Sequence, residues 1–199
     1  MSTPLSRDEA WSLFCEWTES DSLRRHVLAV ETAMRAYAER LGGDPEEWAA
    51  VGLLHDLDYE RHPDMDAEDG HPRTAMRLLA DMDVPEHWVR AIASHADFLE
   101  VPRETPMEKA LYAVDELSGF LMACACVRPE GIHGLTPKSV KKKLKQPSFA
   151  AAVNRDDIIR GAEDLGVELD EHIRVVVAAL EERADELELH GERSAPATG

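Results

Sequence analysis

The chain has 199 residues, a length that suits about one large domain and can bury a hydrophobic core without disulfide or metal staples. Its formal net charge of -18 gives a surface that repels phosphate backbones, so general binding to nucleic acid is not expected. The three cysteines lack zinc-knuckle spacing, the first residues lack a signal-peptide pattern, and no apolar run reaches the length of a membrane span. We therefore expect a cytoplasmic protein without a membrane partner.

Strong helix-start signals recur along the chain, the first being a capping box of serine and glutamate at residues 6–9. This box predicts a first helix that runs to about Trp17. Apolar residues at steps of three and four predict a second helix over about 22–41, which two glycines end. Asp44 followed by Pro45 then opens a third helix, which should end near residues 56–58.

The rest of the chain also predicts helices and loops. Residues 58–70 are acidic and have no helical period, which indicates a loop. Further helices are expected at about 71–82, 85–96, 105–126 and 136–145, from residue 154 onward, and at about 169–189. Because no segment shows the sustained alternation of a strand, we predict an all-α fold.

We interpret residues 1–190 as one helical domain. Its core is expected at about 22–127, and a C-terminal helical extension at about 136–190. The tail at 191–199 is expected to be disordered, because it is polar and lies at the end of the chain.

Several titratable side chains fall on helix faces that the apolar spacing predicts to be buried. His55 shares a face with Trp48, Val51 and Gly52, and Asp56 follows it at the end of the same helix. An ionised carboxylate near a core is costly unless it is paired or holds a cation. The doublet is therefore a candidate for chemistry.

Asp115 presents the same problem on a later helix, where it lies beside an apolar stripe, four residues after Leu111. Its burial calls for a counter-charge, which either a metal ion or an arginine could supply. His26 and His95 also lie at the edges of predicted buried faces. Neutral imidazoles combined with carboxylates suit manganese, iron, cobalt, nickel or zinc better than calcium.

The order of these residues along the chain resembles the signature of a known family. His26, the doublet His55-Asp56 and the distant Asp115 resemble the H…HD…D signature of the HD superfamily of metal-dependent phosphohydrolases. The resemblance covers about residues 22–118. It implies a helical core in which these four residues bind a divalent transition metal, and hydrolysis of a nucleotide or another small anionic phosphate ester.

Many members of that superfamily have two further histidines and hold two metals, which the aspartate of the doublet bridges. His71 and His95 stand in the corresponding intervals and are the candidates for these additional ligands. The nearby alternatives are His62, in the acidic loop, and His87, early in its helix. Their surroundings favour exposed positions for both.

The sequence departs from the two-metal pattern directly after the doublet. Many two-metal members continue with Ile-Gly-Lys, whereas this chain continues with Leu57-Asp58-Tyr59, so one phosphate-binding lysine is missing. Cleavage of a cyclic dinucleotide is therefore not expected. Asp58 could act as a general base, orient a ligand histidine, or remain a solvated loop carboxylate. Arg25, beside His26, is a candidate for neutralising charge that develops during the reaction.

Five of the six lysines gather within residues 137–145. Their spacing places four of them on one helix face, here called the lysine stripe: Lys138, Lys141, Lys142 and Lys145. Because lysine is well suited to phosphate, we expect the stripe to overhang the metal site and bind a phosphorylated or other polyanionic substrate. The alternative is a solvated basic face that pairs with the acidic surface.

The leading hypothesis is metal-assisted hydrolysis of a phosphate ester. One alternative is a di-iron oxygenase that cleaves a C–C or C–P bond, because some proteins that resemble the superfamily use the same six-ligand pattern in this way. Another is a regulatory module that binds a nucleotide without turnover. The complete set of ligand residues argues against that module.

Overall fold

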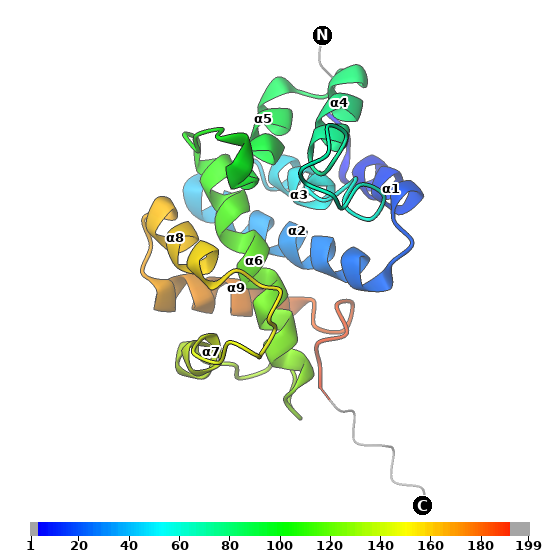
Figure 1. Ribbon diagram of the computed structural model, residues 1–199. Helices are drawn as coiled ribbons and strands as arrows, with labels where there is room; N and C mark the ends of the chain where they lie inside the picture. The colour runs from blue at the N-terminus through cyan, green and yellow to red at the C-terminus, as the bar shows by residue number, and fades with distance from the viewer. Residues whose placement is uncertain (1–3, 192–199) are drawn as a thin grey trace, which may run out of the picture.

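The computed structural model describes residues 4–191, and every regular element in that range is helical, as predicted (Figure 1). The elements are α1 (Arg7–Trp17), α2 (Asp21–Leu41), α3 (Pro45–Leu54), α4 (Arg73–Asp81), α5 (Glu86–His95), the 3-10 helix η1 (Asp97–Leu99), α6 (Pro106–Cys126), α7 (Pro137–Leu144), α8 (Arg155–Leu165) and α9 (Leu169–Glu182).

The two longest helices, α2 and α6, pack against each other, and most other helices pack on this pair (Figure 1). Two glycines let neighbouring helices approach closely. A Cβ atom at Gly52 of α3 would lie 3.0 Å from the Cα of Glu31 in α2, and a Cβ at Gly161 of α8 would lie 2.6 Å from the Cα of Ala113 in α6. Glycine at these positions therefore allows α3 and α8 to pack closer to the central pair than a residue with a side chain would.

Capping boxes fix where α1 and α6 begin, and the one at the start of α1 forms as predicted. The hydroxyl of Ser6 accepts a hydrogen bond from the Glu9 amide, and the Glu9 carboxylate accepts from the Ser6 amide. Thr105 and Glu108 make the same reciprocal pair at the start of α6. These bonds satisfy amides that a helix leaves free at its N-terminus.

The last helix is shorter than the sequence predicts. It ends at Glu182, and residues 183–189 continue as turns that still bury Leu187 and Leu189. The guanidinium of Arg183 bonds to the buried carboxylate of Glu31, 3.0 Å away, which ties the chain to α2 at this point. The spacing of the apolar residues after Glu182 fits a helix, but a series of turns buries the same side chains, Leu187 and Leu189. The predicted tail, from residue 192 on, lies outside the described residues.

No helix within residues 4–191 combines the length and the apolar composition that crossing a membrane requires.

Candidate metal centre

The six predicted ligand residues come together from five separate parts of the chain. His26 lies on α2, His95 ends α5, and Asp115 lies in the middle of α6, while the other three lie in the connection between α3 and α4: His55, Asp56 and His71. Their side chains form two groups, each with its potential ligand atoms within 4.8 Å of one another. The first group is His26, His55 and Asp115, and the second is Asp56, His71 and His95.

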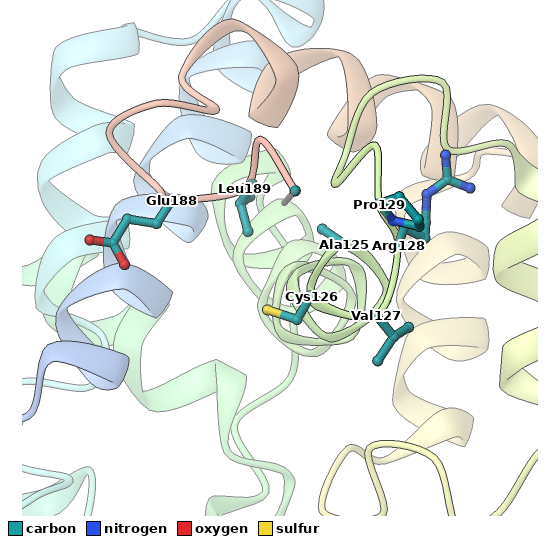
Figure 2. Close-up of a pocket in the computed structure, with 8 residues that line it drawn as sticks. Ala125, Cys126, Val127, Arg128, Pro129, Glu188 and Leu189 are labelled. Atoms are coloured by element: carbon teal, nitrogen blue, oxygen red, sulfur yellow. The ribbon is translucent and has the colours of Figure 1, made fainter. Parts of the chain in front are cut away.

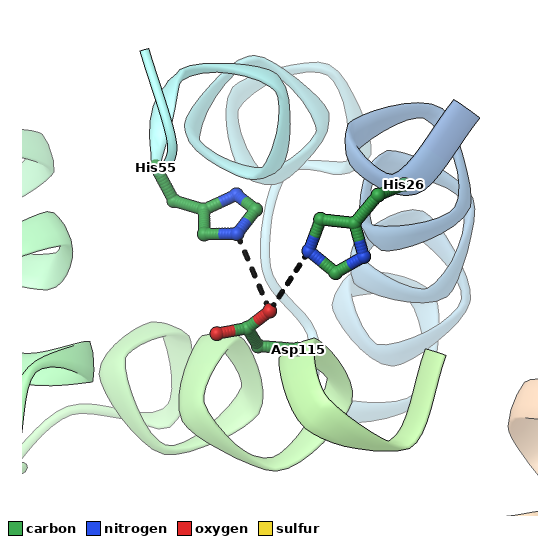
Figure 3. A group of neighbouring side chains, drawn as sticks. All are labelled: His26, His55 and Asp115. Atoms are coloured by element: carbon green, nitrogen blue, oxygen red, sulfur yellow. Dashed lines mark hydrogen bonds and ion pairs between the residues drawn. The ribbon is translucent and has the colours of Figure 1, made fainter. Parts of the chain in front are cut away.

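In the first group, both imidazoles point at one carboxylate oxygen (Figure 3). The Nε2 atom of His26 lies 3.0 Å from Oδ1 of Asp115, and the Nε2 atom of His55 lies 3.4 Å from the same oxygen. His26 lies on α2, Asp115 lies on α6, and His55 follows directly after the end of α3. The packing of these three helices therefore determines the geometry of the group.

The carboxylate of Asp56 lies between the two groups. Its Oδ2 atom faces the first group, 3.6 Å from Nε2 of His26 and 3.5 Å from Nε2 of His55. Its Oδ1 atom faces the second group, 3.4 Å from Nε2 of His71. One carboxylate thus presents one oxygen to each group, an arrangement that can bridge two cations.

Hydrogen bonds on the far side of the imidazole rings fix their protons. The Nδ1 atom of His55 donates to the Gly52 carbonyl, 2.8 Å away, and the Nδ1 atom of His95 donates to the Ile92 carbonyl. A carbonyl oxygen can only accept, so each Nδ1 carries a proton, and in the neutral ring Nε2 keeps a bare lone pair. Both histidines stand at helix C-termini, where such carbonyls lack helical partners.

These bare nitrogen atoms give a direct test of whether a metal fits. The Nε2 atoms of His71 and His95 lie 3.2 Å apart, and each ring donates through Nδ1, so when both rings are neutral two lone pairs face each other. The Nε2 atom of His55 is fully buried without a hydrogen-bond partner. Facing lone pairs repel, and a buried acceptor without a partner is costly. A divalent cation in each group would satisfy these atoms, so the residues fit the metal that the resemblance implies.

Burial and neighbouring charges shift the pKa values of two imidazoles in this cluster in opposite directions. Burial lowers the pKa of His55, but the charges of Asp56 and Asp115 outweigh it and raise that pKa to about 9. For His95, burial and the neighbouring His71 lower the pKa to about 4. Burial alone would raise the pKa of Asp115, yet His55 and His26 hold it below its ordinary range.

Asp58 contacts a candidate ligand residue and does not line the cleft. Its side chain is fully buried, and its two oxygens accept hydrogen bonds from Nδ1 of His71 at 2.8 Å and from the Ala75 amide at 2.7 Å. Burial raises the pKa of this carboxyl, but these hydrogen bonds outweigh burial and lower the pKa below its ordinary value. Of the three roles that the sequence left open for Asp58, the contacts favour orientation of His71.

Replacing Asp58 by asparagine is expected to weaken metal binding by about 10- to 100-fold, because asparagine has one acceptor oxygen for the two donors, His71 and the Ala75 amide, and lacks the negative charge that holds the His71 ring. Titration against a competing chelator measures this affinity. Asp66→Asn is the matched control, since Asp66 is an exposed carboxylate in the neighbouring loop. Equal affinities for the two variants would rule out a positioning role for Asp58.

A cleft of about 640 Å³ opens over the two groups. Five of the six ligand residues line it; the buried His55 is the exception. The wall also contains residues that the sequence analysis did not single out, from the 58–70 loop, η1, α6 and α8: Tyr59, Met65, Phe98, Tyr112, Glu116 and Asp157. Tyr112 lies three residues before Asp115 on the same face of α6, and this spacing was the available signal for it.

Arg25 and the lysine stripe are not brought into this cleft. The Arg25 guanidinium forms an ion pair with Glu188 at 3.0 Å, and Glu188 lines a different pocket, at the C-terminal end of α6 (Figure 2). The stripe lies on α7, which packs against α9 and α6, and Lys141 pairs with Asp170 at 2.6 Å. No stripe residue lines the cleft. These contacts favour the solvated basic face, the alternative interpretation of the stripe.

Charge reversal at Lys138 and Lys142 is therefore expected to leave KM within about twofold of the wild-type value, because solvent screens charges on a separate face. Both side chains are exposed, so the fold should tolerate the change. Steady-state kinetics on any phosphate ester that the protein hydrolyses would measure this. A large rise in KM would instead indicate that the stripe takes part in substrate binding.

The two alternative histidines lie outside the metal groups. His87 is exposed on α5 and lies 2.6 Å from a Glu47 oxygen, and His62 lies 3.4 Å from Asp69. Neither belongs to a cluster of three potential ligands among the described residues. The structure thus brings together His71 and His95 and leaves His62 and His87 apart.

A helical core with a buried histidine–aspartate centre at the base of a cleft defines a class of helical protein with a candidate metal site. Residues 23–119, almost half of the chain, match the family model of the HD domain. This match is consistent with the HD superfamily that the order of the candidate ligands resembles, and an HD domain indicates the superfamily of metal-dependent hydrolases. Comparison with curated proteins and with solved structures gave no match.

Proposed function

We propose that the protein hydrolyses a phosphate ester with divalent transition-metal ions held by the two histidine–aspartate groups. The observation that carries the proposal is the set of Nε2 atoms that converge around Asp56 and Asp115, including two that face each other at 3.2 Å. With neutral rings and no cation the facing pair is repulsive, and with cations the two groups would form a binuclear site of nitrogen and oxygen ligands.

Bound metal ions would supply Lewis acidity, which polarises a phosphoryl oxygen and lowers the pKa of water. The chain orients its own groups for this chemistry. Helix-terminal carbonyls hold the rings of His55 and His95, and Asp58 holds the ring of His71. His26 and Asp115 keep about a fifth of their side chains exposed on the cleft side, which is where a substrate would approach.

The decisive experiment combines elemental analysis with an assay. The protein is purified without a chelator or a polyhistidine tag, and its metal content is measured. The same sample is assayed for phosphate release from a panel of phosphate esters, with and without added manganese. About two metals per chain together with metal-dependent phosphate release is the expected result.

Other outcomes point to the alternatives. Two irons per chain and oxygen-dependent turnover without phosphate release would favour the di-iron oxygenase. Tight nucleotide binding without any turnover would favour the regulatory module. Metal-free protein that cannot be loaded would contradict both the proposal and the di-iron alternative.

A further inference from the structure

Exposed apolar side chains gather at the mouth of the cleft. Seven large apolar side chains are exposed in the described part of the chain, and three of them line this cleft: Tyr59 at 39%, Met65 at 42% and Phe98 at 44%. Exposed apolar groups that cluster around a concave polar site mark a binding surface more often than isolated ones do. The clustering indicates that part of a ligand covers these side chains.

The cleft wall offers no free cationic side chain. Within residues 4–191, the lining contains neither lysine nor arginine. Two arginines beside the wall are paired with its carboxylates. Arg160 bonds to Asp97 at 2.6 Å and to Asp157 at 2.7 Å, and Arg103 bonds to Asp97 at 2.7 Å. A third, Arg73, donates to the Met65 and Ala67 carbonyls at the rim. Positive charge at the base of the cleft must therefore come from the metal centre itself.

The charge available at that centre is small. Two divalent cations held by Asp56 and Asp115 leave a surplus of at most two positive charges, and the buried carboxylate of Asp58 reduces it further. A single phosphate monoester dianion is enough to neutralise this surplus. A polyphosphate chain would bring additional negative charge against Glu116 and the other wall carboxylates, where the described lining residues include no lysine or arginine to meet it.

We propose that the cleft selects a phosphomonoester whose leaving group is apolar and preferably aromatic, and that it rejects polyphosphates. Phe98 and Tyr59 are the specificity-determining residues, because they form the apolar part of the mouth. This inference rests on the proposed function and names the substrate class of the same site.

The position of Phe98 is fixed before any ligand binds. The guanidinium of Arg73 lies 5.0 Å from the centroid of the Phe98 ring, and it also donates to the Met65 carbonyl at 2.6 Å. Arg73 thus joins η1 to the 58–70 loop across the mouth. On the inner side, the Tyr59 ring meets the His71 ring edge to face, with centroids 5.2 Å apart. A pre-formed apolar rim loses little freedom when it binds a ring.

Binding of phosphonates, which are not hydrolysed, tests this proposal. Manganese-loaded protein is titrated calorimetrically with phenylphosphonate, with methylphosphonate and with the β,γ-methylene analogue of ATP, at constant free manganese. We expect phenylphosphonate to bind about tenfold or more tightly than either of the others, as burial of an aromatic ring predicts. Phe98→Ala should remove the preference for phenyl over methyl while leaving methylphosphonate binding unchanged.

Ile159→Ala is the matched control, because Ile159 is also 44% exposed but does not line the cleft. It should keep the phenyl preference. Equal binding of the two phosphonates, no binding of either, or tighter binding of the ATP analogue would overturn the inference. Turnover of phenyl phosphate tests the proposed function separately: a phenyl preference in binding without phosphate release would count against hydrolysis and not against the assignment of the rim.

Discussion

Replacing His95 by alanine is expected to lower the metal content from about two ions per chain to about one and to reduce kcat by at least about 100-fold. His95 is one of only three side chains in the second group, and its Nε2 atom faces that of His71. The first group keeps all its ligands, so one ion should remain. Elemental analysis and phosphate release measured on the same preparation give both numbers.

His87→Ala is the control for this experiment. His87 lies on the same helix as His95, but it is exposed and lies against Glu47 outside the cleft. Its loss should leave metal content and kcat unchanged. Two metals per chain in His95→Ala would remove that residue from the ligand set. A complete loss of metal would show that the two groups bind cooperatively and not in sequence.

The sequence predicted the helices well where local interactions determine their ends. Ser6 and Thr105 each begin a helix because a hydroxyl and a glutamate three residues later satisfy free amides at the N-terminus. The end of α9 could not be predicted in this way. Glu31, a residue 152 positions away, holds Arg183, and a spacing pattern contains no information about a partner so distant.

The candidate site was also predictable only in part. The residue types in order, His26, His55, Asp56 and Asp115, indicated which side chains carry the chemistry. The pattern did not indicate that Asp56 turns one oxygen to each group, since this depends on how α2, α3 and α6 pack. Arg25 illustrates the opposite case, because a neighbour in sequence points about 100° away around a helix, here toward Glu188.

The positions of the lysine stripe and of the mouth of the cleft also depend on tertiary packing, which a sequence pattern does not contain. The stripe lies on a helix, as its spacing predicted, and Val140 is buried on the opposite side, but the position of the stripe depends on packing against α9. Phe98 lies in a single turn of 3-10 helix that carries no periodic signal. Its importance appears only when folding exposes its ring beside the metal groups.

Acidification is expected to lower the free energy of unfolding by about 3 kcal/mol through one buried histidine, His172. Its ring is fully buried. Nε2 donates to the Ala113 carbonyl at 2.9 Å, and Nδ1 accepts from the Tyr37 hydroxyl at 2.6 Å. The neutral ring is therefore fully satisfied. Burial lowers its pKa to about 4, against an opposing contribution from Ala113.

The direction of the pH effect follows from this lowered pKa. The unfolded chain takes up the proton near pH 6.5, and the folded chain only near pH 4. The stabilisation is complete above pH 6.5 and is lost as the pH falls from about 6.5 to about 4. Urea unfolding at pH 7 and pH 5, in the presence of a chelator, measures part of this loss.

His172→Gln should flatten the pH dependence of unfolding, because glutamine can donate to Ala113 but cannot titrate. His133→Gln, on the exposed surface, should leave the pH dependence as it is in the wild type. The same slope in all three proteins would place the acid sensitivity elsewhere. Ala113 lies two residues before Asp115 on α6, so the bond from His172 also anchors the helix that carries a metal ligand. Loss of that anchor at low pH would therefore disturb the metal centre together with the fold.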